Sequence, residues 1–202
     1  MSMSNITLAA SRPVLADRIG SRTLATDVAL IAAGAALTAG AAQIVIPMWP
    51  VPITGQTFAV LFVGATLGSL RGALSMLLYV GLGVAGLPVF AEGGAGLAKL
   101  AGPTGGYMIG FVLAAALVGW LAQKQWDRKV LGTIGAFLAG TAVIYAVGLP
   151  WLSVALGQLG YPNDLNATLQ AGLYPFIPGD LIKALAAGGL LPLVWKLTSR
   201  AN

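Results

Sequence analysis

The stretch Tyr174-Pro-Phe-Ile-Pro-Gly-Asp180-Leu-Ile-Lys183-Ala-Leu-Ala-Ala places two charges in a strongly apolar part of the chain. No other charged residue lies between Gln170 and Lys196. A charge at the centre of a bilayer costs about 2.5 to 3.5 kcal/mol on insertion scales. Because Asp180 and Lys183 are three residues apart, a helix places them on one face, where each charge offsets the other. We therefore expect a paired acid and base near one end of a membrane-spanning helix.

Two interpretations of this pair remain open at this point. A paired ionisable group at membrane depth is, by default, a candidate binding site. The alternative is a structural ion pair that holds two helices together. Pro178 and Gly179 favour a helix that begins just before the pair, since proline fits the first helical turn. The pair is then expected close to one membrane surface.

The composition is that of a polytopic membrane protein and excludes a soluble domain. The chain has 202 residues, of which 57% are hydrophobic and only 8% charged, and its mean hydropathy is +0.86. It contains no cysteine and no histidine, which removes disulfides, thiol chemistry and the commonest metal ligand and general base. We expect no metal site and no catalytic residue. The scattered basic residues form no patch for nucleic acid.

Six stretches of this chain are apolar enough to be membrane helices, which need about 20 residues each. They are residues 24–46, 55–70, 72–87, 105–123, 130–149 and 177–197. The turn Ser69-Leu-Arg-Gly72 separates the second from the third, which are both short. We expect an all-α fold with one six-helix membrane domain over residues 23–202, preceded by a poorly ordered N-terminal tail over residues 1–22.

The basic residues outside the helices fall on one side of these six spans. They are Arg12, Arg18, Arg22, Arg71, Lys124, Arg128, Lys129, Lys196 and Arg200, while Lys99 lies on the other side. Cytoplasmic loops are rich in Lys and Arg, so both termini are predicted to be cytoplasmic. Asp180 and Lys183 then face outside, as do the three longer connections over residues 47–54, 88–104 and 151–175. A substrate pocket is expected near this outer face.

Two outer segments carry further candidate ligand groups. Pro50-Val-Pro-Ile-Thr54-Gly-Gln56 is an extended segment stiffened by its prolines, with Thr54 as the predicted N-cap of the next helix. Gln56 follows in the first turn and can both donate and accept hydrogen bonds. The connection over residues 86–107 contains seven glycines. Such a loop is often only a flexible connector, but its length and its side of the membrane favour a loop over an outer pocket.

Small residues recur every four positions in the first span, at Ala32, Ala36 and Gly40. This spacing lets a second helix approach closely. The second helix can belong to the same chain or to another membrane subunit, and the spacing favours neither.

Four segments together give the chain a resemblance to a known family. They are Pro50-Val-Pro-Ile-Thr-Gly-Gln56, Gly86-Leu-Pro-Val-Phe90, Gly102-Pro-Thr-Gly-Gly-Tyr107 and Phe176-Ile-Pro-Gly-Asp-Leu-Ile-Lys183. With these segments in this order, the chain resembles the BioY family, the biotin-binding S components of energy-coupling factor (ECF) transporters. The resemblance covers all six spans and leaves out only the N-terminal tail.

The resemblance implies a six-helix protein of a prokaryotic cell membrane, with a biotin pocket near the outer face. It implies that the pocket is formed by Gln56, Tyr107, Asp180 and Lys183, with backbone of Gly93 and Gly94. It also implies two kinds of partner, a transmembrane coupling subunit and two cytoplasmic ATPase subunits, with Ala32, Ala36 and Gly40 on the docking surface. No cofactor is implied, since biotin is the transported ligand.

Biotin suits the chemistry of the charged pair. Ionised Asp180 can accept from the ureido N–H groups, whereas Lys183 can donate to the ureido oxygen or to the carboxylate, and the sequence does not decide between the two. Two alternatives stay open: an S component for another vitamin, and a stand-alone secondary carrier in which the pair couples protons to transport. An intramembrane enzyme is disfavoured because histidine, cysteine and a GxSxG motif are missing.

Overall fold

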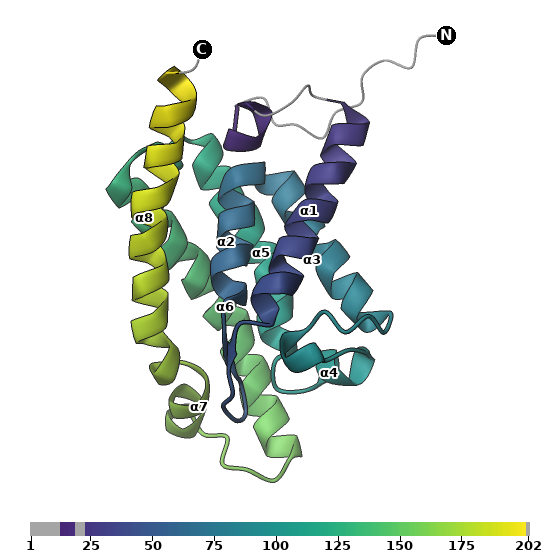
Figure 1. The fold of residues 1–202 in the computed structure, drawn as a ribbon. Helices are drawn as coiled ribbons and strands as arrows, with labels where there is room; N and C mark the ends of the chain where they lie inside the picture. The colour runs from purple at the N-terminus through teal and green to yellow at the C-terminus, as the bar shows by residue number, and fades with distance from the viewer. Residues whose placement is uncertain (1–12, 19–22, 201–202) are drawn as a thin grey trace.

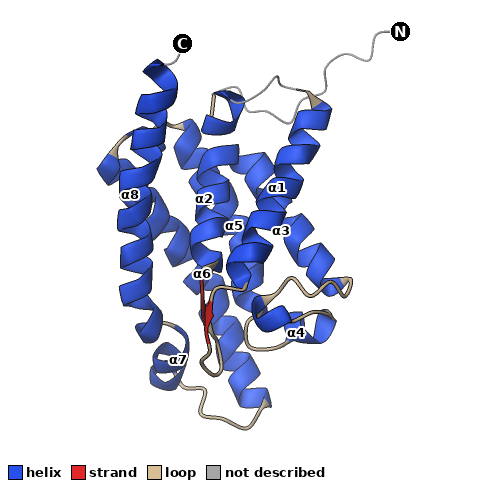
Figure 2. Ribbon diagram, in the orientation of Figure 1, coloured by secondary structure: helices blue, strands red, loops and turns tan. Residues whose placement is uncertain are grey.

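The computed structural model describes residues 13–18 and 23–200, which are almost entirely helical (Figures 1 and 2). The longer helices are α1 (Leu24–Ala42), α2 (Gln56–Leu67), α3 (Ser69–Val84), α5 (Gly105–Gln123), α6 (Val130–Gln158) and α8 (Ile177–Arg200). The shorter elements are η1 (Leu15–Arg18), β1 (Val45–Ile46), β2 (Ile53–Thr54), η2 (Ala91–Gly93), α4 (Leu97–Ala101), η3 (Trp126–Arg128), α7 (Leu165–Gly172) and η4 (Tyr174–Phe176).

Each of the six predicted spans overlaps one of the longer helices. Within the described residues, four helical stretches are long and apolar enough to cross a membrane: Leu24–Ala42, Gly105–Gln123, Val130–Gln158 and Leu165–Thr198. The apolar helices α2 and α3 are shorter, with 12 and 16 residues. At 1.5 Å per residue α2 is only about 18 Å long, well short of the roughly 30 Å hydrocarbon core. The all-α, multi-pass prediction is confirmed, with two of its six helices short.

Helix α5 lies in the middle of the bundle, packed by α2, α3 and α6 (Figure 1). It is apolar around its whole circumference, as expected of a buried helix. Close approach to α2 depends on Gly64, where an added Cβ would lie only 2.5 Å from the carbonyl oxygen of Ala115 on α5. Small residues thus bring the backbones of the two helices together, as is common between membrane helices.

The turn between α2 and α3 differs from the prediction by a few residues. It is formed by Gly68 alone, whose φ of +87° is readily adopted only by glycine. Ser69 already begins α3, so the predicted turn residues Arg71 and Gly72 are helical. The charge of Arg71 suggested a loop between the two helices. In the structure, Arg71 is part of α3 and pairs with buried carboxylates.

Arg71 is 3% exposed and pairs with two carboxylates at the predicted cytoplasmic end. Its Nη1 lies 3.1 Å from Oδ1 of Asp27 on α1, and its Nη2 lies 2.6 Å from Oδ1 of Asp17 in η1. Its Nε donates to the carbonyl oxygen of Leu67 at 2.9 Å. One arginine therefore ties three segments together at this end of the bundle.

Part of the predicted N-terminal tail packs as part of the membrane domain. Val14, Leu15 and Ala16 are buried against the end of the bundle, and η1 contacts α2. The rest of the predicted tail, residues 1–12 and 19–22 with Arg12 and Arg22, lies outside the described residues.

Other boundaries also differ from the prediction, including the end of α3 at Val84, three residues before the predicted end. Helix α1 ends at Ala42, four residues before the predicted end, because a two-stranded hairpin follows in which Val45 pairs with Thr54. Helix α6 continues through Pro150 to Gln158, nine residues beyond the predicted end at residue 149. Membrane helices tolerate an internal proline because neighbouring groups satisfy the freed carbonyl. Helix α8 continues three residues beyond the predicted end, to Arg200.

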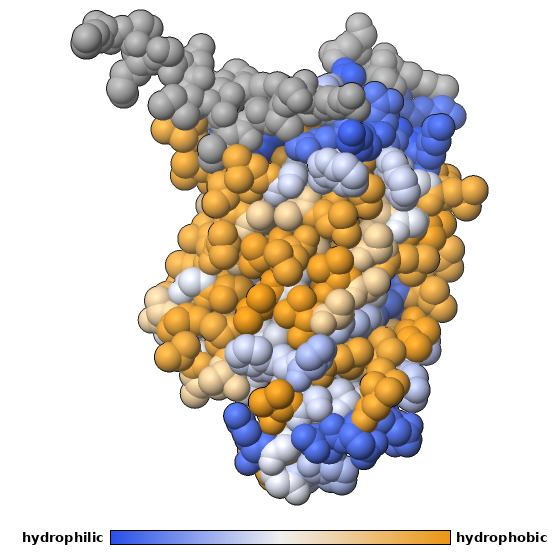
Figure 3. Space-filling view, turned by 180° about the vertical axis from the view of Figure 1, so that it is seen from behind, coloured by the Kyte–Doolittle hydropathy of each residue, from blue (hydrophilic) through white to orange (hydrophobic). Residues whose placement is uncertain are grey.

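The two ends of the molecule differ in character. The hairpin, α4 and α7 gather at one end, opposite η1 and the end of α8 (Figure 1). On the face shown in Figure 3, a broad hydrophobic band lies between hydrophilic regions at the two ends. The connection with Lys124, Arg128 and Lys129 lies at the same end as η1, in agreement with the predicted cytoplasmic side.

Candidate ligand-binding site

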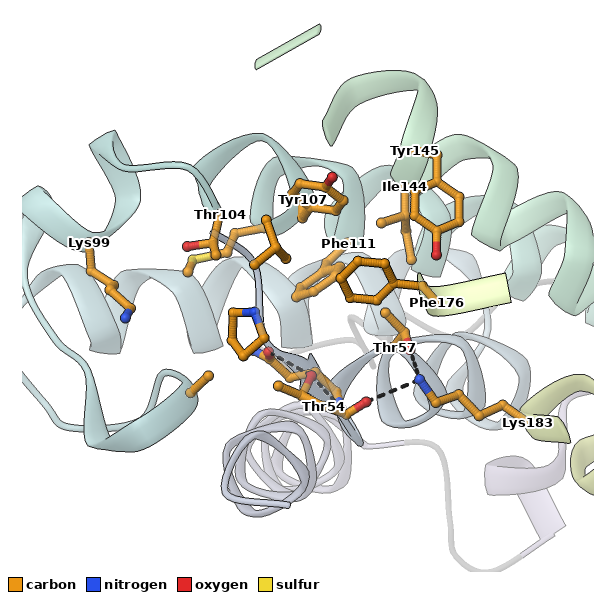
Figure 4. Close-up of a pocket in the computed structure, with 15 residues that line it drawn as sticks. Thr54, Thr57, Lys99, Thr104, Tyr107, Phe111, Ile144, Tyr145, Phe176 and Lys183 are labelled. Carbon is orange, nitrogen blue, oxygen red and sulfur yellow. Dashed lines mark hydrogen bonds between the residues drawn. The ribbon is translucent and has the colours of Figure 1, made fainter. Parts of the chain in front are cut away.

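A cavity opens at the predicted outer end, among the β2–α2 junction, α5, α6 and the beginning of α8 (Figure 4). Its volume is about 570 Å³, including the open space at its mouth. It is lined by Val51, Pro52, Thr54, Gln56, Thr57, Ala91, Lys99, Thr104, Tyr107, Met108, Phe111, Ile144, Tyr145, Phe176 and Lys183.

One wall of the cavity is aromatic. Tyr107 and Phe111 lie one helical turn apart on α5, so both side chains point from the same face. The ring of Tyr145 on α6 meets Tyr107 edge-on at 6.3 Å between centroids and Phe176 at 6.5 Å. Edge-to-face packing of this kind holds the rings in place. This wall provides a rigid, mostly apolar surface for a flat or cyclic ligand.

Lys183 forms the opposite, polar side, and its ammonium group is fully engaged. Its Nζ donates to the carbonyl oxygen of Thr54 at 3.0 Å, to Oγ1 of Thr57 at 2.7 Å and to Oδ1 of Asp180 at 3.5 Å. An ammonium has three protons, so each has one acceptor. The pairing of Asp180 with Lys183, expected from their spacing, is confirmed.

Asp180 is placed just behind the cavity wall. It is 7% exposed and does not itself line the cavity. One carboxylate oxygen accepts from Lys183, and the other accepts from the hydroxyl of Tyr145. Asp180 therefore orients two side chains that do line the cavity, and it neutralises the charge of Lys183.

Gln56 lines the cavity at the beginning of α2 and is 6% exposed. Its amide Nε2 donates to the hydroxyl of Tyr79 on α3. The predicted N-cap Thr54 instead ends β2, and Gly55 caps α2. The hydroxyl of Thr54 still accepts from the backbone N–H of Gln56 at 3.2 Å. The Pro-Val-Pro segment thus serves as the arm of a hairpin that carries Thr54 and Gln56 to the cavity.

Tyr107 also lines the cavity, through its ring. Its hydroxyl donates to the carbonyl oxygen of Gly172 at 3.0 Å, which ties α5 to the end of α7. A Cβ at Gly148 on α6 would lie 2.7 Å from the Tyr107 ring, so glycine is needed there for the ring to fit. Because its hydroxyl is bonded to the backbone, Tyr107 is placed to offer a surface for packing.

Gly93 and Gly94 do not line the cavity, although Ala91 in the same loop does. The N–H of Gly93 donates to Oε1 of Gln43 at 3.2 Å, and the amide nitrogen of Gln43 donates to the carbonyl oxygen of Phe90 at 3.1 Å. Gln43 caps the end of α1 and so holds the loop to that helix. The backbone groups expected to meet a ligand are therefore used, in part, within the loop.

The cavity contains residues that the sequence analysis did not select, among them Thr57, Lys99, Tyr145 and Phe176. Tyr145 is a polar residue inside an apolar helix, a signal of the same kind as the charged pair. Lys99 was noted only as the basic residue on the outer side. The small residues Ala32, Ala36 and Gly40 lie on the exposed face of α1, away from the bundle.

We expect Tyr145→Phe to weaken ligand binding about tenfold to a hundredfold, because a hydrogen bond to a charged group contributes about 1.5 to 3 kcal/mol. The substitution keeps the ring in the aromatic wall and removes only the donor to Asp180. Titration of purified protein with ligand measures the effect. Tyr161→Phe is the control, because Tyr161 is a tyrosine that does not line the cavity; an equal loss in both variants would contradict the assigned role.

Comparison with known proteins agrees with these features. The family model described as BioY family matches residues 10–200. A biotin transporter BioY of Thermotoga maritima is 40% identical over 160 residues, covering 78% of this chain and 90% of the relative. A probable biotin transporter BioY of Pyrococcus horikoshii is 39% identical over 163 residues, covering 81% and 92%.

A solved structure is also similar over most of its length. It is the crystal structure at 2.1 Å of the S-component for biotin from an ECF-type ABC transporter, with a TM-score of 0.73 and 30% sequence identity. The match covers 85% of this chain and 92% of that one. Both the fold and the extent of the family match lead to one conclusion: this multi-pass membrane protein belongs to the BioY family.

Proposed function

We propose that this chain binds biotin at the outer face of a prokaryotic membrane, as the substrate-specific S component of an ECF-type transporter. The observation that carries the proposal is the cavity beside the buried Asp180–Lys183 pair, in a chain whose relatives are named biotin transporters. The proposal includes no chemical reaction: the protein binds and delivers its ligand.

The two sides of the cavity suit the two characters of biotin. The bicyclic ring is largely apolar and fits against the aromatic wall of Tyr107, Phe111 and Phe176. Its ureido group has two N–H donors and one C=O acceptor. On the polar side, the hydroxyl of Thr57 and the amide of Gln56 can both donate and accept hydrogen bonds, next to the ammonium of Lys183. Asp180 fixes this side through its bonds to Lys183 and Tyr145.

The proposal extends to the partners of an ECF module, a transmembrane coupling subunit and two cytoplasmic ATPase subunits. We infer that α1 docks to the coupling subunit through Ala32, Ala36 and Gly40. All three are exposed, and a Cβ added at Gly40 would meet no atom within 4 Å in the part of the chain described. An exposed stripe of small residues allows a helix of another subunit to come close.

We expect Gly40→Leu to leave biotin binding unchanged and to reduce co-purification with the coupling subunit tenfold or more, because overpacking a tight helix contact costs about 1 to 3 kcal/mol. Affinity pull-down after co-expression measures both. Gly189→Leu is the matched control, since Gly189 is exposed on α8 and also has no neighbour within 4 Å. Equal loss in the two variants would contradict docking through α1.

The ligand assignment is tested by thermal unfolding of the protein in nanodiscs against a panel of vitamins. A ligand present at 100 times its Kd stabilises the folded state by about 2.7 kcal/mol, so biotin should raise the unfolding temperature while thiamine and riboflavin should not. Stabilisation by another vitamin alone would contradict the biotin assignment. Uptake by the lone protein that an uncoupler abolishes would instead indicate a secondary carrier.

A further inference from the structure

We propose that Lys99 binds the carboxylate of the ligand, at the opposite end of the cavity from Lys183. This assignment rests on the proposed function and names the residue that selects for an anionic ligand. Lys99 lies in α4, in the glycine-rich connection between α3 and α5, and lines the cavity.

The two lysines lie at opposite ends of the cavity (Figure 4). Tyr107, Phe111 and Phe176 lie between them in this view. A ligand that spans the cavity therefore meets a polar group at each end and an apolar surface in its middle. Biotin has that order of groups, with the ureido ring at one end, an apolar ring and chain in the middle, and the carboxylate at the other end.

The charges in the cavity favour an anionic group near Lys99. Among the described residues that line the cavity, Lys99 and Lys183 are charged and none is acidic. Lys183 is neutralised by Asp180 at 3.5 Å. Within residues 13–18 and 23–200, the structure gives Nζ of Lys99 no ion pair or hydrogen bond, and the neighbouring Glu92 does not pair with it. The site as built carries one uncompensated positive charge, which suits a monocarboxylate.

Lys183 is less suited than Lys99 to bind the carboxylate of the ligand. Its three protons are used by Thr54, Thr57 and Asp180. To bind a carboxylate it would have to release one of these acceptors and bring a second anion near Asp180. The ammonium of Lys99 has all three donors available to a ligand. The geometry thus places the ureido ring, not the carboxylate, beside Lys183.

The stem of Lys99 packs closely against Gly94. A Cβ at Gly94 would lie 3.0 Å from Cε and 3.4 Å from Cδ of Lys99, so the lysine stem lies against the bare backbone of Gly94. The φ of Gly94 is −64°, which any residue can adopt. Glycine leaves room for the Lys99 stem here, whereas a Cβ would require that flexible stem to shift by a few tenths of an ångström.

The assignment is tested by comparing two ligands, biotin and its neutral amide, in wild type and Lys99→Gln. We expect wild type to bind biotin about tenfold to a hundredfold more tightly than the amide, because only the carboxylate of biotin can form a charge-assisted hydrogen bond with Lys99. Lys99→Gln should lose that preference by weakening biotin binding while leaving amide binding unchanged. Lys99→Arg should keep it, because its guanidinium also binds carboxylate. Lys124→Gln, an exposed lysine beyond the end of α5, serves as the charge control.

A Lys99→Gln protein that still prefers biotin over the amide to the full extent would overturn the assignment. So would loss of the preference in Lys183→Gln with Lys99 intact. If wild type binds neither biotin nor the amide, the proposed function itself is wrong. If wild type binds both ligands equally, biotin binding stands and only the role of Lys99 is refuted.

Discussion

Lys183→Ala is expected to destabilise the protein by about 3 to 5 kcal/mol and to abolish measurable ligand binding. The substitution leaves Asp180, 7% exposed, without its cation, and an uncompensated buried charge is more costly than the loss of an ordinary hydrogen bond. It also frees the carbonyl oxygen of Thr54. Unfolding of the purified protein in detergent measures the stability, and calorimetric titration measures the binding.

A double variant separates the two effects. Lys183→Met combined with Asp180→Asn removes both charges, and replacement of a complete buried pair by neutral groups is often close to neutral for stability. We expect the double variant to recover most of the lost stability while binding stays absent. Recovery of binding together with stability would mean that the pair is only a structural link between segments.

Arg71→Ala is the second change with a large expected effect, about 3 to 5 kcal/mol of stability, because it breaks two buried ion pairs of one guanidinium. It leaves Asp17 and Asp27 without the guanidinium that joins η1, α1 and α3. The cavity lies at the other end of the bundle, so we expect unchanged affinity for biotin in the protein that remains folded. Thermal unfolding and titration on the same sample measure the two quantities.

Lys129→Ala is the matched control for Arg71, since Lys129 is exposed at the same end of the molecule. It should change stability by less than about 0.5 kcal/mol, as surface substitutions usually do. Adding Asp27→Asn to Arg71→Ala should restore part of the stability. Equal stability of Arg71→Ala and wild type would contradict the role given to Arg71 at the predicted cytoplasmic end.

The sequence predicted the helices and the charged pair well because those signals are local. Asp180 and Lys183 stand out against an apolar stretch, and their helical spacing alone implies that they meet. Gln56 was selected from its place after the Pro-Val-Pro segment and Tyr107 through the family resemblance, and the structure brings both to the cavity with Lys183. Their roles toward a ligand stay predictions.

Other features depend on contacts between distant parts of the chain. The end of α1 at Ala42 follows from the hairpin beyond it. Helix α6 was predicted to end at residue 149, but it continues through Pro150 within the bundle. Lys99 resembled an ordinary loop lysine, and only the folded chain shows that it lines the cavity. Arg71 likewise resembled a loop residue until its two carboxylates were placed around it.

Equilibrium binding of biotin to the protein in nanodiscs, for wild type and Asp180→Asn, tests the central claim most directly. We expect tight one-to-one binding by wild type and a loss of at least tenfold in the variant, because a neutral amide at this position cannot neutralise Lys183. Size-exclusion chromatography shows whether both proteins are folded. No binding by a folded wild type, or equal binding by a folded variant, would contradict a biotin site built around the Asp180–Lys183 pair.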